Sequence, residues 1–380
     1  MRRRESKQAL IRRMVIFPAI LLACGVAAPA QFTPFEAAIA NFDSEVAAGV
    51  AKDAVGCVSV AVFIGNKVIW TKGYGWADME NRVPAGPDTI GRIGSITKPF
   101  TAVALMQLAE RGLVKIDDPV EKYFAQIKGL ASTPENMRPI TFRMLASHTA
   151  GLVREPQLAD AASGSIYLWE DKILQSILKT GFRSAPLTEY SYSNIGFGIL
   201  GLAISRAAKV PYMELVREQI LKPLGMTSST FILDNPDLWE RMSVGYVRDQ
   251  KTGKVSSEAP TKEHFGRGYK VPNGGIYSTV GDLARFAAAM MGEHPVKILS
   301  VESRKEMLTA QAPAKTYGLG FMVPEEAGPR IVGHNGSVAG YNADLAFELD
   351  TRIGIAMLRT TSYNPPTRRL LVQLIAAVRK

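Results

Sequence analysis

Cysteine is almost absent from this sequence of 380 residues, which contains only Cys24 and Cys57. Cys24 falls in an N-terminal segment with the pattern of a secretion signal, so the mature chain would keep one cysteine and could form no internal disulfide. Cys57 lies in an apolar, β-branched run that ends at Phe63. This setting favours a small buried hydrophobic residue over a reactive thiol.

Histidine is also scarce, and its four positions show no metal-ligand spacing. We therefore expect neither a metal nor another cofactor. Lysine and arginine form no cluster interleaved with aromatic residues, which argues against nucleic acid as a partner.

Long hydrophobic runs are missing as well. No stretch reaches the roughly 18 apolar residues that span a bilayer, so we expect no integral membrane domain. The chain is 47% hydrophobic and 21% charged, which suits a folded protein with a large core. The sequence does not indicate an oligomeric state.

The N-terminus has the pattern of an export signal. A basic stretch up to Arg13 precedes an apolar run from Met14 to Ala28, and Ala28-Pro29-Ala30 then offers small residues to a signal peptidase. This predicts a signal peptide over 1–30, cleavage before Gln31 and a periplasmic or secreted protein. Residues 1–30 carry six basic residues and one acidic residue, so the net charge of +10 would fall to +5.

Three other interpretations of this segment stay open. The apolar run could serve as an N-terminal membrane anchor, although it is short for that role. Arg12-Arg13 could belong to a twin-arginine signal. The stretch Leu21-Leu22-Ala23-Cys24 loosely resembles a lipoprotein cleavage site, which would leave Cys24 lipidated.

Strand-like segments occur at both ends of the chain. Apolar residues at helical spacing predict a first helix from Phe35 to Val50, followed by a hairpin of strands 57–63 and 67–73. Further strands are predicted over 317–323, 330–334, 341–349 and 353–360, before a final helix over 370–378. One sheet built from both ends, with the two terminal helices on its face, would unite these segments.

The region between them is mostly helical. Helices are predicted over 100–111, 140–146, 169–178 and 195–208, whereas 245–270 is polar and is expected to form loops or a hairpin. The predicted fold class is α/β (α+β): an antiparallel sheet flanked by terminal helices, with an inserted helical subdomain and an active site in the cleft between. We place the domain at 31–380, the sheet subdomain at about 31–94 and 271–380, and the helical subdomain at about 95–270.

Ser95 and Lys98 form the first candidate for chemistry. Ser95 precedes a long apolar helix, where oriented amide groups favour developing negative charge. A spacing of three puts Lys98 on the same face, and a neutral lysine could take the serine proton. By itself this pattern also describes a serine N-cap followed by a solvated lysine.

The second candidate is Tyr192 with Asn194, on a loop before a helix. A tyrosine hydroxyl near a lysine can relay protons, and an asparagine amide can donate to a substrate carbonyl. The plainer alternative is a packing tyrosine and an asparagine helix cap.

The third candidate is His334-Asn335-Gly336-Ser337, at the end of a predicted strand. His334 would line the cleft, and Gly336 would let a substrate approach the backbone. The amide of Ser337 could join that of Ser95 as an oxyanion hole. A structural histidine is the alternative.

In this order and at these spacings, the three motifs resemble the serine β-lactamase and penicillin-binding-protein superfamily, in its class C β-lactamase and D-alanyl-D-alanine carboxypeptidase-like branch. Its pattern is S-x-x-K, Y-x-N and K-T-G or H-x-G, and the resemblance spans about 35–375. It implies that Ser95 is the nucleophile, Lys98 its activating neighbour and Tyr192 a proton relay that protonates the leaving group. It also implies substrate contacts from Asn194, His334, Gly336 and Ser337. The division of base work between Lys98 and Tyr192 stays open.

The H-x-G form of the third motif bears on the substrate. A mostly neutral His334 binds a carboxylate less strongly than the lysine of K-T-G would. We therefore expect a serine hydrolase for an ester or amide, of the esterase or D-amino-acid peptidase and carboxypeptidase type, with β-lactamase activity ranked lower. The expected partners are small-molecule or peptide substrates, including cell-wall peptides. The main alternative is a penicillin or cell-wall-peptide sensor that turns over slowly.

Two further segments resemble catalytic motifs but are expected to be structural, and a third is expected to affect specificity. Lys251-Thr252-Gly253 spells K-T-G, but it lies in a polar stretch and is predicted to be a hairpin turn. His148 could suggest a Ser-His dyad, but the resemblance places it on a structural turn. The segment 154–168 is predicted to form a variable lid that sets specificity.

Overall fold

The structure is a computed structural model that describes residues 33–131, 137–324 and 328–379. The predicted signal peptide and Cys24 lie outside this range. Within the described part, no helix is both long and apolar enough to cross a membrane.

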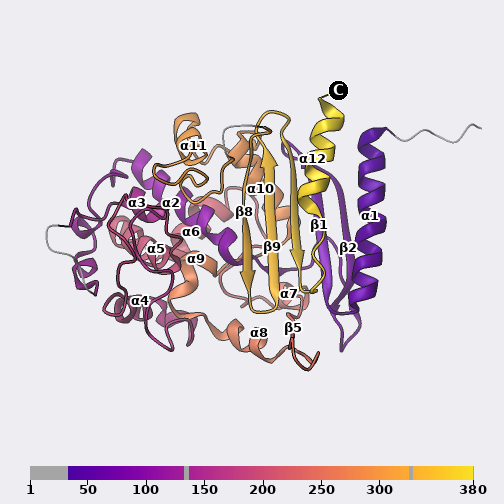
Figure 1. The fold of residues 1–380 in the computed structure, drawn as a ribbon, viewed down its shortest axis with the longest axis horizontal. Helices are drawn as coiled ribbons and strands as arrows, with labels where there is room; N and C mark the ends of the chain where they lie inside the picture. The colour runs from indigo at the N-terminus through magenta and orange to yellow at the C-terminus, as the bar shows by residue number, and fades with distance from the viewer. Residues whose placement is uncertain (1–32, 132–136, 325–327, 380) are drawn as a thin grey trace, which may run out of the picture.

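A six-stranded antiparallel sheet is built from both ends of the chain, as predicted (Figure 1). Because β1 pairs with β10, the N-terminal hairpin joins the C-terminal strands in one sheet. The strands run in the order β3 (Val83–Pro84), β2 (Lys67–Asp78), β1 (Cys57–Ile64), β10 (Ile353–Arg359), β9 (Tyr341–Glu348) and β8 (Ile331–Val338). Two small two-stranded sheets pair β4 (Gly91–Arg92) with β7 (Tyr277–Ser278) and β5 (Val247–Arg248) with β6 (Val255–Ser256).

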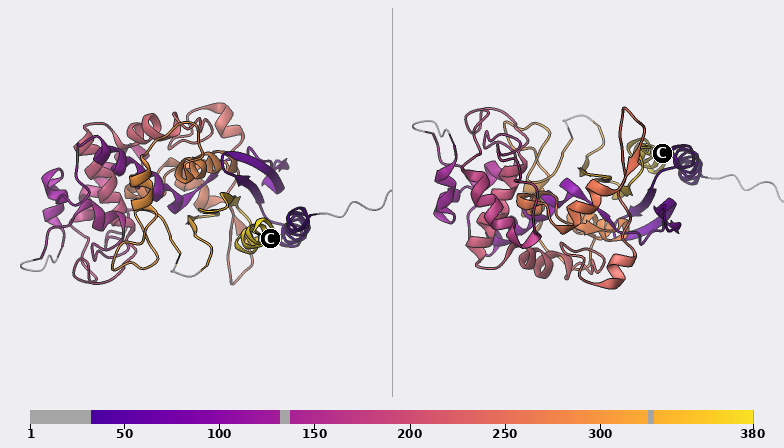
Figure 2. Two further views of the ribbon diagram at one scale, coloured as in Figure 1. Left: turned by 90° about the horizontal axis from the view of Figure 1, so that it is seen from above. Right: turned by 90° about the horizontal axis from the view of Figure 1, so that it is seen from below.

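The terminal helices cover one face of this sheet, as predicted. In helix α1 (Pro34–Asp53), Phe42, Val46 and Val50 are buried in one cluster with Leu371 and Leu374 of α12 (Thr367–Val378). Figure 2 shows the two helices side by side on the same side of the sheet. The N-terminus of α1 is fixed by a capping box between Thr33 and Glu36.

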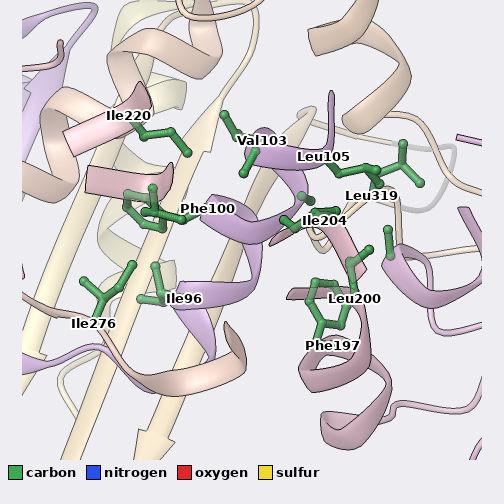
Figure 3. Packing of buried hydrophobic residues seen from close by; sticks show 14 of the residues in the cluster. Ile96, Phe100, Val103, Leu105, Phe197, Leu200, Ile204, Ile220, Ile276 and Leu319 are labelled. Carbon is green, nitrogen blue, oxygen red and sulfur yellow. The ribbon is translucent and has the colours of Figure 1, made fainter. Parts of the chain in front are cut away.

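The opposite face packs on helix α10 (Val280–Met291) and on the helical part of the chain. Helix α2 (Thr97–Glu110) lies at the centre of that part and packs against α5 (Asn194–Ala208). Figure 3 shows Phe100 and Val103 of α2 in the same packed region as Phe197 and Leu200 of α5.

The remaining helices are short. They are α3 (Phe142–Ala146), α4 (Trp169–Ile177), α6 (Tyr212–Val216), α7 (Pro236–Glu240), α8 (Glu258–Lys262), α9 (Val271–Gly274) and α11 (Val301–Met307). Single 3₁₀ turns are η1 (Gly94–Ile96), η2 (Val120–Lys122), η3 (Ala125–Gly129), η4 (Ile166–Leu168), η6 (Glu263–Phe265) and η7 (Gly268–Lys270), and η5 (Arg217–Leu221) is a π-helical turn.

One predicted strand is wrong, and one helix was not predicted. The segment 317–323 is not a strand, because Gly320 adopts a left-handed φ of 77° and turns the chain back, with one isolated bridge between Tyr317 and Met322. Helix α10 was not predicted, although its apolar residues are spaced as in an amphipathic helix, with Asp282 and Arg285 as its charged residues. Its start is marked by Thr279, whose side chain accepts the amide hydrogen of Asp282.

Three smaller predictions have a clear outcome. The string Lys251-Thr252-Gly253 lies in the turn of the β5–β6 hairpin, as predicted. Cys57 is buried, also as predicted. His334 lies within β8 rather than at a strand end, because β8 continues to Val338 while paired with β9.

The packing of α2 against α10 generates a stability prediction. Phe100 is fully buried and its ring stacks on Phe286 with centroids 3.8 Å apart. Phe100→Ala should lower the free energy of unfolding in urea by about 3–5 kcal/mol, because it removes buried area and leaves a cavity. Phe265 is 77% exposed, so Phe265→Ala is the matched control and should change it by less than about 0.5 kcal/mol. Equal effects of both substitutions would contradict this packing.

Candidate active site

Ser95 lies in turn η1, between the edge strand β8 and the first turn of α2. Gly94 adopts a left-handed φ of 50°, and a Cβ atom there would lie 2.9 Å from the amide nitrogen of Ser337. A Cβ on Gly336 would lie 1.9 Å from the carbonyl oxygen of Ile93. The two glycines therefore let η1 and β8 approach backbone to backbone.

This approach brings two amide groups to one place. Gly333 exchanges both of its backbone hydrogen bonds with Met322, on the side of β8 that faces away from β9. Because strand geometry repeats every two residues, the amide of Ser337 points to the same open edge, where η1 lies. The Ser95 and Ser337 amides thus have the placement that an oxyanion hole requires.

Lys98 is fully buried, one helical turn after Ser95. Its Nζ lies 3.0 Å from Ser95 Oγ, 2.8 Å from Asn194 Oδ1 and 3.3 Å from the carbonyl oxygen of Asn273. The sequence predicted the first of these contacts from the spacing of three. Burial lowers the pKa of Lys98 well below its ordinary value, and the nearby charge of Arg154 lowers it further.

The orientation of the Asn194 amide follows from its neighbours. Its Nδ2 donates to Glu155 Oε1 at 2.6 Å, and a carboxylate can only accept, so Oδ1 faces Lys98. The predicted alternative of an asparagine cap is wrong, because the N-cap of α5 is Ser193 and its side chain accepts the amide hydrogen of Gly196. Asn194 is the first helical residue, and its side chain links Lys98 to Glu155.

Tyr192 lies across the same space. Its ring centroid is 4.7 Å from Lys98 Nζ. Burial raises the pKa of Tyr192 to about 12, although the nearby Ser95 side chain opposes this shift. The hydroxyl is therefore protonated near neutral pH.

His148 supports Tyr192 from behind. The two rings have centroids 4.2 Å apart, and His148 Nδ1 accepts the amide hydrogen of Ser193 at 3.0 Å. His148 itself has a left-handed φ of 60° in the turn after α3. This is the structural turn that the resemblance implied, and it shapes the loop that carries Tyr192.

His334 is buried in β8, and both ring nitrogens have partners. Nδ1 lies 2.5 Å from the carbonyl oxygen of Asn335, which can only accept, so Nε2 accepts from the Tyr317 hydroxyl at 3.0 Å. Burial, together with the charge of Lys98, lowers the pKa of His334 to about 3. The ring is therefore neutral and supplies no positive charge to the site.

The structure thus gathers all seven residues that the sequence singled out: Ser95, Lys98, Tyr192, Asn194, His334, Gly336 and Ser337. Among the described residues, no group of three or more histidine, cysteine and acidic side chains could hold a metal ion.

Sequence reasoning missed Asn273 and the role of Glu155. Asn273 Nδ2 donates to the carbonyl oxygen of Asn194 at 2.6 Å, while its own carbonyl oxygen faces Lys98. Glu155 lies in the segment predicted to be a lid, and nothing in that segment's composition distinguishes it from an exposed acidic residue.

Comparison with known proteins is consistent with this geometry. The sequence model of the Beta-lactamase family matches residues 42–380. The D-alanyl-D-alanine-carboxypeptidase/endopeptidase AmpH of Escherichia coli K12 is 29% identical over 328 residues, which are 82% of this chain and 80% of that protein.

Solved structures show the same fold. The octameric penicillin-binding protein homologue from Pyrococcus abyssi has a TM-score of 0.75 at 28% identity, covering 90% of this chain and 78% of that one. The D-amino acid amidase from Ochrobactrum anthropi SV3 has a TM-score of 0.72 at 23% identity, covering 90% and 99%. The family match extends over most of the chain, so this protein belongs to the β-lactamase family, within the superfamily of serine β-lactamases and penicillin-binding proteins.

Proposed function

We propose that this protein is a serine hydrolase that cleaves an ester or amide through an acyl-enzyme on Ser95. The observation that carries the proposal is the environment of Lys98. A neutral amine has two N–H donors and one lone pair. The carbonyl oxygen of Asn273 and the Oδ1 of Asn194 accept the two N–H groups, which leaves the lone pair directed at Ser95 Oγ, 3.0 Å away.

Acylation then proceeds as follows. Lys98 accepts the Ser95 proton as Oγ attacks the carbonyl carbon, and the amides of Ser95 and Ser337 stabilise the oxyanion. Tyr192 donates a proton to the leaving group as its bond to the carbonyl carbon breaks, and it recovers one from the Lys98 ammonium. A water molecule then attacks the carbonyl carbon of the acyl-enzyme and gives a proton to Lys98 or Tyr192. As the bond to Ser95 Oγ breaks, this proton passes to Oγ and restores the hydroxyl group.

The geometry favours Lys98 over Tyr192 as the acylation base. The pKa of Lys98 is well below that of a free lysine, whereas the pKa of Tyr192 is raised to about 12. A general base works best when its pKa is close to the operating pH. These shifts support our proposal that Lys98 abstracts the proton and that Tyr192 delivers it.

The substrate class proposed is a D-amino-acid peptide or an ester. The similar Escherichia coli protein is named a D-alanyl-D-alanine carboxypeptidase and endopeptidase, which supports a peptide substrate. The neutral His334 supports ranking efficient β-lactam hydrolysis below these activities. A periplasmic or secreted location, proposed from the N-terminal sequence, would place the enzyme beside cell-wall peptides.

A slowly turning-over sensor is the alternative proposal. The same acylation geometry would serve it, so the deacylation rate separates the two proposals. Mass spectrometry of the wild type after mixing with substrate distinguishes them, because an acyl group that persists on Ser95 without turnover would identify the sensor.

Substitution of the nucleophile tests the proposal. Ser95→Ala should lower kcat/KM for 4-nitrophenyl butyrate by about 10³-fold or more and abolish acylation, since no other group replaces Oγ. Ser44→Ala is the control, because Ser44 is exposed on α1 at the far face of the sheet. Activity that survives in the Ser95→Ala protein would contradict the proposed nucleophile.

The role of Lys98 predicts the pH dependence. The neutral amine is the active form, so kcat/KM should rise with pH through the pKa of Lys98 and then level off. Because burial lowers this pKa, the plateau should be reached well below pH 10.4, the ordinary pKa of lysine. A rise centred near that ordinary value would contradict the assignment.

Removal of the amine tests the same role independently. Lys98→Met keeps the length of the side chain and should lower kcat by about 10²- to 10⁴-fold, the usual contribution of a general base. Thermal unfolding, followed by circular dichroism, shows whether the variant remains folded. A folded variant with full activity would exclude Lys98 as the base.

A further inference from the structure

Arg154 lies over the ring of Tyr192, at the exposed side of the site. Its guanidinium carbon is 4.9 Å from the Tyr192 ring centroid, and its side chain is 66% exposed. The Arg154 carbonyl oxygen accepts the amide hydrogens of Asn194, at 2.9 Å, and Ile195, at 3.3 Å. The backbone of Arg154 is thus held at the start of α5, beside the residues that contact Lys98.

Within the described residues, the guanidinium group of Arg154 makes an ion pair but donates no hydrogen bond. The nearest carboxylate is that of Glu155, 3.9 Å away, which is beyond hydrogen-bonding distance. Glu155 Oε1 already accepts from Asn194, while Oε2 accepts the Tyr269 hydroxyl and faces Lys270 at 3.4 Å. Within residues 33–131, 137–324 and 328–379, the Arg154 side chain donates no hydrogen bond.

The other cations near Lys98 are engaged. Lys270 pairs with Glu155, and Arg267 is buried, donates to the carbonyl oxygen of Gly274 at 2.7 Å and pairs with Glu263. His334 is a neutral ring with both nitrogens bonded. Of the three cations that act on Lys98, Arg154 is the most exposed, and its ion pair with Glu155 is loose, at 3.9 Å.

We propose that Arg154 binds a carboxylate carried by the leaving group of the substrate, such as the free C-terminus of a peptide. The planar fork of an arginine matches a carboxylate with two parallel hydrogen bonds. We assign the carboxylate to the leaving group because Tyr192 is proposed to protonate that group. The Arg154 guanidinium group lies over the Tyr192 ring and is therefore on the same side of the site. This inference rests on the proposed acyl transfer at Ser95.

Three matched esters test the proposal. The neutral reference is 2-nitrophenyl butyrate. The ester 3-butyryloxy-4-nitrobenzoate adds a carboxylate to the leaving group, and 2-nitrophenyl hemisuccinate adds one to the acyl group instead. For each ester, kcat/KM is measured after the uncatalysed rate has been subtracted. The value for each charged ester is then divided by the value for the neutral ester, so that a general loss of activity cancels in the ratio.

Arg154→Gln should lower the ratio for 3-butyryloxy-4-nitrobenzoate about tenfold or more and leave the hemisuccinate ratio unchanged, because a charge-assisted contact is lost on one side only. Arg154→Lys should keep part of the preference. Arg183→Gln is the matched control, because Arg183 is 68% exposed but pairs with Glu189. This variant should keep both ratios at their wild-type values.

Each other outcome overturns the proposal in a recognisable way. Unchanged ratios in Arg154→Gln, with the neutral ester still hydrolysed, would contradict the Arg154 site alone. A fall confined to the hemisuccinate would overturn the assignment to the leaving group. If the wild type hydrolysed no ester faster than the Ser95→Ala protein does, the proposed hydrolase function would be contradicted and the Arg154 proposal would fall with it.

Discussion

An amine without exposed surface is costly unless its hydrogen bonds are satisfied, and the site of this protein depends on how Lys98 meets that requirement. Its partners are Ser95 Oγ, the Asn194 amide oxygen and the Asn273 carbonyl oxygen, which come from three separate segments. The three segments must be held in place together for all three of these bonds to form. Much of the fold around α2 can be understood as the support for that arrangement.

The support has two layers. Helices α2 and α5 pack through large apolar side chains, which fixes Lys98 against the start of α5 (Figure 3). A second layer of polar contacts then orients the amide of Asn194, through Glu155 and Asn273. Apolar packing sets the distance between the elements, whereas the hydrogen bonds set the direction in which each polar group points.

The site also requires that the two ends of the chain meet. Strand β8 comes from the C-terminal part, yet its open edge lies against η1, which follows the N-terminal hairpin. Pairing of β1 with β10 brings these distant parts together, and the glycines at 94 and 336 remove the side chains that would keep them apart. The charge of the site then depends on which groups are buried, since His334 is neutral while Arg154 stays cationic and exposed.

By itself, the sequence determined the strands and helices with clear periodicity, the sheet built from both ends, and the seven residues of the three motifs. The strands and helices follow from local spacing, whereas the roles of the seven residues were implied by the resemblance of the three motifs to a known superfamily. The segment 317–323 was predicted as a strand because the sequence does not show that Gly320 adopts a left-handed φ. Helix α10 was overlooked although its apolar residues are spaced as in an amphipathic helix. Only the tertiary structure showed that burial lowers the pKa of Lys98, that Asn273 and Glu155 contact the motif residues, and that Arg154 is exposed with only a loose ion pair to Glu155. Burial and hydrogen-bond partners arise from residues far apart in the chain, so no local pattern contains them.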